Sequence, residues 1–319
     1  MGEDNGNCYL CGREGLEVIR TKLRYNIQRD VLRCRCCGII YLQPRTVPGG
    51  YYENEYRNLY TPVFGKRLTA RQIFDICLPN QERRIEDIRH IIKPQMRLLD
   101  VGCSAGHFLH AVSSYVGECI GIEFNKEEAE FASKTLGFRI YTKPVEHTDI
   151  SYEYFDVITV FQVLEHMAEP ASFLKTIGRY LTHDGYLIVE VPNVQDALMS
   201  LYDIEEYRDF WFREPHIFYY SPDTLSAMLE KCGFSGRTST TQNFNLANHF
   251  HWMLNRKPQL NNAEMSRPVL VNSDSTAPEI KKEFNQWFQK LDQEYKRLLN
   301  KHQIGENVFC IATKKTCNP

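Results

Sequence analysis

The segment at residues 97–110, RLLDVGCSAGHFLH, constrains the fold of this chain more than any other. It reads as an apolar strand ending at Asp100, a turn that contains Gly102 and Gly106, and the start of an apolar helix. Such a turn brings free backbone N–H groups to the edge of a sheet, and its glycines let a ligand approach the backbone closely. We therefore expect a small polar ligand to bind at this turn.

The spacing within the turn separates two kinds of adenosine-containing cofactor. Dinucleotide-binding folds use G-x-G-x-x-G, whereas this turn reads D-x-G-x-x-x-G. An acid at position 100 repels a pyrophosphate but suits an ammonium group, such as the amino-acid end of S-adenosylmethionine. Glu123 ends the next apolar run, about 20 residues further on, where a ribose-binding acid is expected in either fold. The charge of Asp100 therefore favours S-adenosylmethionine.

The rest of the chain continues the alternation of strands and helices. Further strands are predicted at 119–122, 138–142, 155–161, 186–191, near 237–243 and at 308–315, and helices at 67–92 (broken near Pro79), 129–136, 171–181 and 222–231, the last capped by Ser221. This order predicts an α/β fold with a doubly wound, mostly parallel seven-stranded sheet. With LLDVGCSAG, GIEFN, FDVITVFQVLEHM and GYLIVEVPN in this order, residues 70–315 resemble the class I S-adenosylmethionine-dependent methyltransferases, which are Rossmann-like.

The resemblance implies a set of cofactor contacts. Asp100, Gly102, Cys103, Ser104 and Gly106 would line the methionine part, Glu123 would bind the ribose and Phe124 would flank the adenine, with Glu146 near its edge and Phe161 and Gln162 near the sulfonium. The family often has glycine at the position of Ser104. Phe161 is equally well explained as a core residue, and Glu146 as a solvated one. Glu165 and His166 look like a catalytic pair, but residues there more often brace the following helix.

Two C-x-x-C-G knuckles lie near the N-terminus. Between the pair Cys8 and Cys11 and the pair Cys34 and Cys37 lie 22 residues, the spacing of a zinc ribbon in which four thiolates close a structural site. A module of residues 1–43 is too small for an adequate apolar core, so a bound Zn²⁺ would supply its folding energy. Disulfides or free thiols are the alternative interpretation. The chain has 11 cysteines, an odd and scattered set that indicates a reducing compartment.

Composition limits the class of protein further. With 319 residues, of which 43% are hydrophobic, the chain can form one large domain, residues 66–319, beside the small module. A net charge of −2 argues against a nucleic-acid substrate. No apolar run is long enough to span a bilayer, and the N-terminus lacks the parts of a secretion signal. We expect a soluble, cytoplasmic protein.

The candidate acceptor site draws on two aromatic segments. The connector at residues 44–65 carries Tyr51, Tyr52 and Tyr56, which either cover the cofactor as a lid or dock the ribbon on the main domain. The segment after the strand at 186–191 carries Trp211, His216, Tyr219 and Tyr220. His216 is the candidate base, because imidazole accepts a proton near neutral pH, and Tyr219 is the alternative. A structural histidine that bonds a loop backbone explains His216 equally well.

A C-x-x-C ribbon combined with H-x-x-Y-[FY]-S, here residues 216–221, resembles methyltransferases of surface-polysaccharide and deoxysugar pathways. The carbon-methylating members often have Glu directly before the histidine, where this chain has Pro215, and they carry a long C-terminal domain that is absent here. We therefore expect O-methylation of a sugar, glycan or other small-molecule hydroxyl. Carbon methylation of a nucleotide deoxysugar, an RNA or protein substrate recognised by the ribbon, and a noncatalytic binding subunit are the alternatives.

An insertion at residues 245–305 separates the last two strands. Its Pro-, Asn- and Ser-rich part, residues 257–278, is predicted to be a loop, and the helix after it places Ile280, Phe284, Trp287, Phe288, Leu291, Tyr295 and Leu298 on one face. This apolar face is expected to pack on its own domain or to form the contact of a homodimer.

Overall fold

The computed structural model describes residues 6–46, 66–259, 265–274 and 276–315. Most of the connector, with Tyr51, Tyr52 and Tyr56, lies outside these residues, so the lid prediction stays a prediction. Among the described residues, no helix is long and apolar enough to cross a membrane.

The larger of the two sheets has seven strands in the order β10-β11-β8-β7-β4-β5-β6. Its strands are β4 (Arg97–Val101), β5 (Glu118–Ile122), β6 (Arg139–Tyr141), β7 (Phe155–Phe161), β8 (Leu181–Pro192), β10 (Phe234–Thr241) and β11 (Asn307–Lys314). The pairs from β6 to β8 are parallel, and β11 runs antiparallel to both of its neighbours. The predicted mostly parallel seven-stranded sheet is confirmed.

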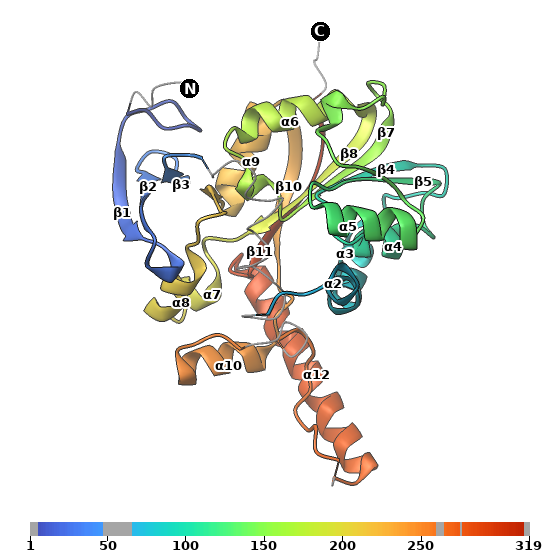
Figure 1. The fold of residues 1–319 in the computed structure, drawn as a ribbon. Coiled ribbons are helices and arrows are strands. Elements are labelled where there is room, and N and C mark those ends of the chain that lie inside the picture. Colours follow the sequence, from blue (N-terminus) through green and yellow to red (C-terminus); the bar gives the residue numbers. More distant parts are fainter. Residues whose placement is uncertain (1–5, 47–65, 260–264, 275, 316–319) are drawn as a thin grey trace.

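Helices cover both faces of this sheet (Figure 1). Adjacent residues of a strand point to opposite faces: Leu98 packs with α3 (Gln81–Ile88) and α4 (His107–Val112), whereas Leu99 belongs to the cluster under α6 (Pro170–Gly178) and α9 (Pro222–Lys231). The predicted helix at 67–92 is broken as expected: α2 (Ala70–Cys77) is followed by a 3₁₀ turn, Leu78–Asn80, and then by α3.

Two predicted boundaries and one cap can be compared directly with the structure. Ser221 caps α9 through its side chain, which accepts a hydrogen bond from the Thr224 backbone N–H, as expected. The predicted helix at 171–181 ends at Gly178, because Leu181 already pairs with Phe155 as the first residue of β8. The predicted helix at 129–136 is α5 (Lys126–Glu130) followed by a π-helical turn, Phe131–Thr135.

The second sheet has four antiparallel strands and joins distant parts of the chain. β1 (Leu16–Lys22), β2 (Gln28–Cys34) and β3 (Ile40–Gln43) come from the N-terminal module, and β9 (Phe218–Tyr219) comes from the segment before α9. Ile40 pairs with Tyr219, and the backbone N–H of Leu42 donates to the Ile217 carbonyl over 2.8 Å. Leu32 and Tyr41 share one apolar cluster with the large sheet. The N-terminal module is therefore built into the main domain.

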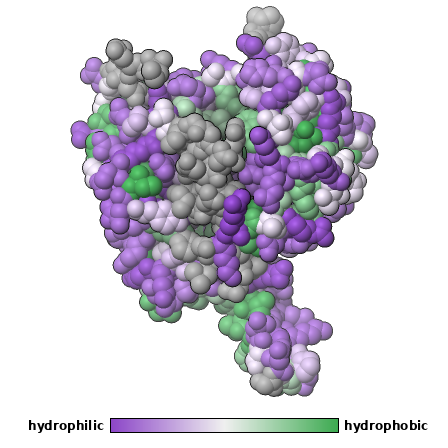
Figure 2. Space-filling view, viewed as in Figure 1, coloured by the Kyte–Doolittle hydropathy of each residue, from purple (hydrophilic) through white to green (hydrophobic). Residues whose placement is uncertain are grey.

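The insertion forms an arm below the body (Figure 1). It consists of α10 (Leu246–Asn255) and α12 (Pro278–Lys301). Only Phe288 of the predicted apolar face is buried, whereas Trp287 is 57% exposed and Ile280, Phe284, Leu291 and Leu298 are also exposed. Hydrophobic side chains show on the upper part of the arm in Figure 2. The expectation that this face packs on its own domain is therefore wrong for most of its length, because α12 extends beyond the sheet.

Candidate cofactor and acceptor sites

The turn after β4 adopts the backbone that its glycines predict. Gly102 and Gly106 have φ values of 75° and 79°, and Ser104 between them has a φ of 50°. A Cβ atom at Gly102 would lie 2.5 Å from Cγ2 of Val163, so a side chain at this position would collide with the neighbouring loop. Ser104 thus takes the left-handed conformation that the family's usual glycine adopts easily, at a modest cost.

Asp100 lies at the carboxyl end of β4 with only 3% of its surface exposed. Its Oδ1 accepts a hydrogen bond of 2.7 Å from the Thr159 hydroxyl on β7. Burial raises the pKa of Asp100 to about 7, while that hydrogen bond and Arg84 oppose the rise. The sheet order reverses between β4 and β7, and ligands of open α/β sheets bind at such a switch point. A cationic ligand group here would pair with a carboxylate that water hardly screens.

Glu123 follows β5 and supports the turn from the next strand. Its Oε2 accepts the Ser104 backbone N–H over 2.9 Å, and its Oε1 accepts the N–H of Asn125 over 2.7 Å. The Ser104 hydroxyl donates to Glu128. Phe124 is 38% exposed directly after Glu123. The structure thus brings the predicted ribose-binding acid and the turn together, and it leaves an aromatic side chain open beside them.

The other predicted cofactor residues lie in different surroundings. Cys103 is buried under the turn, and Phe161 is a core residue whose ring meets Phe108 edge-on with centroids 4.9 Å apart. Gln162, with a φ of 57°, donates from Nε2 to Asn307 over 3.0 Å. Glu146 is exposed on a 3₁₀ turn, Val145–His147. Their roles toward the cofactor stay predictions.

Sequence reasoning missed a buried ionic group beside this site. Glu190 on β8 is fully buried and pairs with Arg83 and Arg84 of α3. Burial alone would raise the pKa of Glu190, but the charges of Arg83 and Arg84 together lower it to about 2. The Arg84 guanidinium also lies over the Phe161 ring, 4.3 Å from its centroid. The sequence could not predict this pairing, because Arg83 and Arg84 lie in a polar helix and Glu190 lies on a strand more than a hundred residues later.

The predicted acceptor residues lie within residues 193–221, which we call the acceptor side. The Nε2 atom of His216 accepts hydrogen bonds from Nε and Nη2 of Arg213, over 2.9 and 2.7 Å. His216 is 2% exposed, and burial, with Arg213 and His166 adding to it, keeps its pKa well below the usual value. The Tyr219 hydroxyl accepts the Arg213 backbone N–H and donates to the Arg213 carbonyl, over 3.1 and 3.0 Å. Tyr219 therefore holds the loop that presents His216.

Trp211 and Tyr220, predicted to contact the acceptor, are both largely buried. Trp211 is 9% exposed at the end of α8 (Glu205–Trp211), and its ring centroid lies 5.2 Å from that of Tyr219. Tyr220 is fully buried, and its hydroxyl has no hydrogen-bond partner within the described part of the chain. Both aromatic side chains thus pack in the interior, and their contact with an acceptor stays a prediction.

Glu165 and His166 hold the same loop from the other side. They form a 3₁₀ turn, Leu164–His166, after β7. The Glu165 carbonyl accepts the Ile217 N–H over 2.7 Å, and the Nδ1 atom of His166 lies 2.8 Å from the Pro215 carbonyl oxygen. These contacts tie the turn to the loop of residues 215–217, and the role toward the following helix that the resemblance implies stays a prediction. Among the described residues, however, the Glu165 carboxyl group has no hydrogen-bond partner at either oxygen.

A cleft of about 440 Å³ opens between the ribbon and the residues after β8. Val194 and Gln195 directly follow β8, so the cleft lies toward the carboxyl-end edge of the large sheet. It is lined by Ile19, Arg20, Val194, Gln195, Met199, Ser200, Glu205, Arg208 and Phe212. The N-terminal module thus forms one wall of the cleft and α7 (Ala197–Ser200) and α8 form another.

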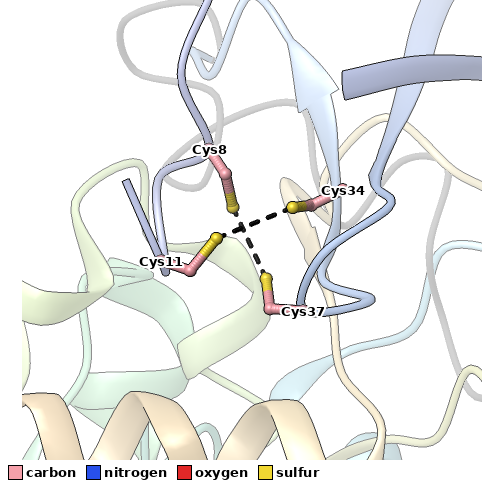
Figure 3. Close-up of side chains that lie close together, drawn as sticks. All are labelled: Cys8, Cys11, Cys34 and Cys37. Atoms are coloured by element: carbon pink, nitrogen blue, oxygen red, sulfur yellow. Dashed lines mark hydrogen bonds between the residues drawn. The ribbon is translucent and has the colours of Figure 1, made fainter. Parts of the chain in front are cut away.

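The four predicted ligand cysteines converge from the two knuckles (Figure 3). The sulfur atoms of Cys8 and Cys37 lie 3.5 Å apart, those of Cys11 and Cys34 3.7 Å apart, and all four lie within 4.8 Å of one another. These separations are too long for disulfide bonds. They are close to about 3.8 Å, the distance between two sulfur atoms that bind the same Zn²⁺ tetrahedrally with Zn–S bonds of about 2.3 Å. Backbone N–H groups of Cys37 and Cys36 outweigh burial and lower the pKa of Cys34 to about 7.

The order of the large sheet, the glycine turn and the two acids at adjacent strand ends define a Rossmann-like fold of the class I S-adenosylmethionine-dependent methyltransferases. The family model described as a methyltransferase domain matches residues 71–239. Because this match covers more than half of the chain, the protein belongs to that family.

Several known proteins resemble this chain over part of its length. An uncharacterized methyltransferase, YcgJ of Bacillus subtilis, is 32% identical over 127 residues, which cover 36% of this chain and 50% of that protein. The ubiquinone biosynthesis O-methyltransferase of Haemophilus ducreyi is 29% identical over 107 residues, or 30% and 45% of the two chains. The chain thus spans about half the length of the curated relatives it matches. A solved structure of an Archaeoglobus fulgidus SAM-dependent methyltransferase matches 75% of this chain and 94% of its own, with a TM-score of 0.48 and 19% identity.

Proposed function

We propose that this protein transfers the methyl group of S-adenosylmethionine to a hydroxyl group of a sugar, glycan or similar small molecule. The observation that carries the cofactor assignment is the buried carboxyl group of Asp100 at the switch point, next to the glycine turn. It supplies the negative charge that the cofactor's ammonium group requires, and Glu123 lies at the adjacent strand end, where the ribose is expected.

The cleft beside the ribbon supports a small polar acceptor. Its volume falls in the range of pockets that hold small molecules, about 300–1,000 Å³. Gln195, Ser200 and Arg208 offer hydrogen-bonding groups, and Phe212 offers an aromatic ring. This combination suits a sugar, whose hydroxyls need polar partners and whose C–H faces pack on aromatic rings.

Methyl transfer to oxygen is an in-line displacement that also releases a proton. The acceptor oxygen forms a bond with the methyl carbon, the carbon–sulfur bond breaks to leave a neutral thioether, and the hydroxyl proton leaves. The protein must align the two reactants and assist that proton loss. We assign the assistance to His216, which is held neutral in the wall of the acceptor side, with Tyr219 fixing its loop through the backbone of Arg213.

Labelled S-adenosylmethionine offers the direct test. The protein is incubated with the methyl-labelled cofactor and separate panels of nucleotide sugars, glycans and RNA, and mass spectrometry locates any methyl group gained. Label on a sugar oxygen is expected. Label on a sugar carbon, on RNA or on protein would replace the proposed acceptor, and cofactor binding with no transfer in any panel would favour a binding subunit.

The His216→Ala variant tests the assignment of the proton step. Turnover is expected to fall by about 10²–10⁴-fold, the usual contribution of acid–base assistance, while cofactor affinity stays within a few fold. His183→Ala is the matched control, because His183 is exposed and pairs only with its neighbour Asp184 in the described structure. An unchanged rate in His216→Ala would eliminate the assignment.

We also propose that Cys8, Cys11, Cys34 and Cys37 bind one structural Zn²⁺. Four converging sulfur atoms match its preferred donor set, and a closed four-thiolate site leaves no open position for catalysis. Cys36 is exposed, and its Sγ lies 3.6 Å from the Glu14 carbonyl oxygen, outside the group. No described cysteine forms a disulfide, which agrees with our proposal of a cytoplasmic location.

We propose a homodimer as the assembly, with the exposed face of α12 as its contact. Trp287, Phe284 and Leu291 lie exposed on one side of this helix. A contiguous apolar surface of this kind is typical of protein–protein contacts.

A further inference from the structure

A second group of potential metal ligands lies on the acceptor side. Glu165, His166 and His216, which we call the Glu–His–His cluster, offer ligand atoms that all lie within 4.8 Å of one another. Oε1 of Glu165 is 3.7 Å from Nε2 of His166 and 3.9 Å from Nε2 of His216. The two imidazole rings meet at an angle of 85°, with centroids 4.9 Å apart. The three side chains thus converge on a common point.

The carboxyl group of Glu165 lies in the interior without a compensating hydrogen bond from any residue that the structure describes. Glu165 is 1% exposed. A buried carboxylate without a partner is strongly unfavourable, so a group of this kind usually binds a cation or keeps a proton.

Both imidazoles present acceptor atoms to Glu165. The Nδ1 atom of His166 faces the Pro215 carbonyl, which only accepts hydrogen bonds, so Nδ1 carries the proton and Nε2 has a lone pair. The Nε2 atom of His216 accepts N–H groups from Arg213 and therefore also has a lone pair. One carboxylate oxygen of Glu165 thus lies less than 4 Å from two imidazole nitrogens, each of which carries a lone pair.

We propose that Glu165, His166 and His216 bind a divalent transition-metal cation of the Zn²⁺ type. Two imidazoles and one carboxylate are the donor set of catalytic zinc sites, and the same set also accepts Mn²⁺, Fe²⁺ and Co²⁺. The hydrogen bond from His166 to the Pro215 carbonyl fixes the ring and its tautomer, as groups behind metal-binding histidines commonly do.

The ligands of the Glu–His–His cluster differ from the four cysteines of the ribbon in type and in the number of coordination positions that they fill. Four thiolates close the coordination of the ribbon ion, whereas three protein ligands leave a position open for a further oxygen. This step rests on the proposed function: an acceptor hydroxyl bound there would have a lower pKa and would release its proton more easily. His216 would then assist proton loss as a ligand, so its replacement would still abolish turnover.

Arg213 is the group that competes with the cation. Its guanidinium occupies the lone pair of His216 Nε2, so coordination through this atom must displace it. The Arg213→Gln variant removes the positive charge and keeps a polar side chain. We expect it to bind the cation more tightly than the wild-type protein does.

Metal content tests the proposal without any acceptor. The full chain, purified and then equilibrated with Zn²⁺, is expected to hold two ions per chain by elemental analysis, one in the ribbon and one in the Glu–His–His cluster. Glu165→Gln, which keeps the volume of the side chain, should hold one. Cys11→Ser with Cys34→Ser should lose the other ion. Glu230→Ala, an exposed acid on α9, is the matched control and should hold two.

Calorimetric titration of Zn²⁺ into the full chain with its ribbon ion in place measures the second site alone. We expect binding at least about 100-fold weaker in Glu165→Gln and His166→Gln, and unchanged in Glu230→Ala. Equal second-site affinity in the wild-type protein and Glu165→Gln, or one ion per chain in both, overturns the proposal. Because neither measurement needs methyl transfer, the cation can be found even if the proposed acceptor is wrong, and the acceptor can be right even if no cation binds.

Discussion

The seven-stranded sheet is assembled mainly from neighbouring strand–helix units, whereas the four-stranded sheet joins residues 16–43 to residues 218–219. The large sheet holds the turn and acids of the cofactor site. The small sheet holds, through β9, the loop of His216 and Tyr219. Through the pairing of β3 with β9, the N-terminal module contacts the proposed acceptor side, so we expect its proposed metal site and the proposed methyl-transfer site to be coupled.

The largest effect is expected from removing the Zn²⁺ that we propose for the N-terminal module. The Cys11→Ser, Cys34→Ser variant should lose its structure around β1–β3, because metal binding supplies the folding energy of such small modules. Hydrogen exchange should then show loss of protection at Ile217–Tyr219, and methyl transfer should fall by at least about 100-fold. Cofactor affinity, a property of the large sheet, should stay within about threefold. Protection kept at Ile217 in the variant would contradict the coupling.

The matched control for this experiment is Cys36→Ser. Cys36 lies in the same knuckle but outside the sulfur group. Its replacement should change neither metal content nor exchange at β9.

Glu190→Gln tests the stability of the large sheet. The change leaves Arg83 and Arg84 without their buried partner, and we expect the free energy of unfolding to fall by about 3–5 kcal/mol in denaturant titrations. Because the folded pKa of Glu190 lies below its ordinary value of 4.5, the pair stabilises the protein above that pH. This contribution is lost as the pH falls toward about 2.

The control for Glu190 is Glu130→Gln. Glu130 is exposed and pairs with Lys134 on the surface of α5, so its replacement should leave the unfolding curve unchanged. Equal curves for the two variants would show that the buried pair does not stabilise the sheet.

Asp100→Asn separates cofactor binding from fold. Loss of a charge-assisted contact should weaken cofactor binding by about 10–100-fold in calorimetry, with zinc content unchanged. In the wild-type protein, Asp100 must lose its proton to pair with an ammonium group, and its pKa is about 7. Affinity should therefore fall as the pH drops below 7, by up to about tenfold per pH unit.

The same pH series on Asp100→Asn should be nearly flat. Asp156→Asn serves as the control, because Asp156 lies at the opposite end of β7 and accepts the Arg97 backbone N–H. A wild-type affinity that does not change between pH 6 and pH 8 would show that Asp100 does not contact the cationic group.

The smallest effect on folding is expected at the arm. Trp287→Gln should change the free energy of unfolding by less than about 0.5 kcal/mol, because the side chain is 57% exposed. Sedimentation should show the variant shifted from dimer to monomer. Phe288→Ala, at the next position but 4% exposed, should instead destabilise the fold. A wild-type protein that sediments as a monomer would eliminate the proposed dimer.

Most of the large sheet was predictable because its signals are local. The apolar run that ends at Asp100 and the one that ends at Glu123 each contain their own strand and turn, and Ser221 lies directly before the helix that it caps. The two sulfur pairs were also predictable, since each knuckle is a short repeat with fixed spacing.

The acceptor side was less accessible to sequence reasoning because its contacts are long-range. Two residues of β9 carry no signal for pairing with Ile40 and Tyr41, nearly 180 positions earlier. Glu165 reads as part of a bracing turn, and only the structure shows that its carboxyl group meets His216 in the interior. The spacing of apolar residues in α12 predicts a buried face. That spacing does not show how far the helix extends beyond the large sheet.

The pairing of β3 with β9 limits how this chain can be shortened. A chain that began after the ribbon would keep every strand of the cofactor sheet yet leave Phe218 and Tyr219 as a bare edge, with the apolar partners of Leu32 and Tyr41 open to water. Such a fragment would keep the residues of the proposed cofactor site but would tend to associate through that edge.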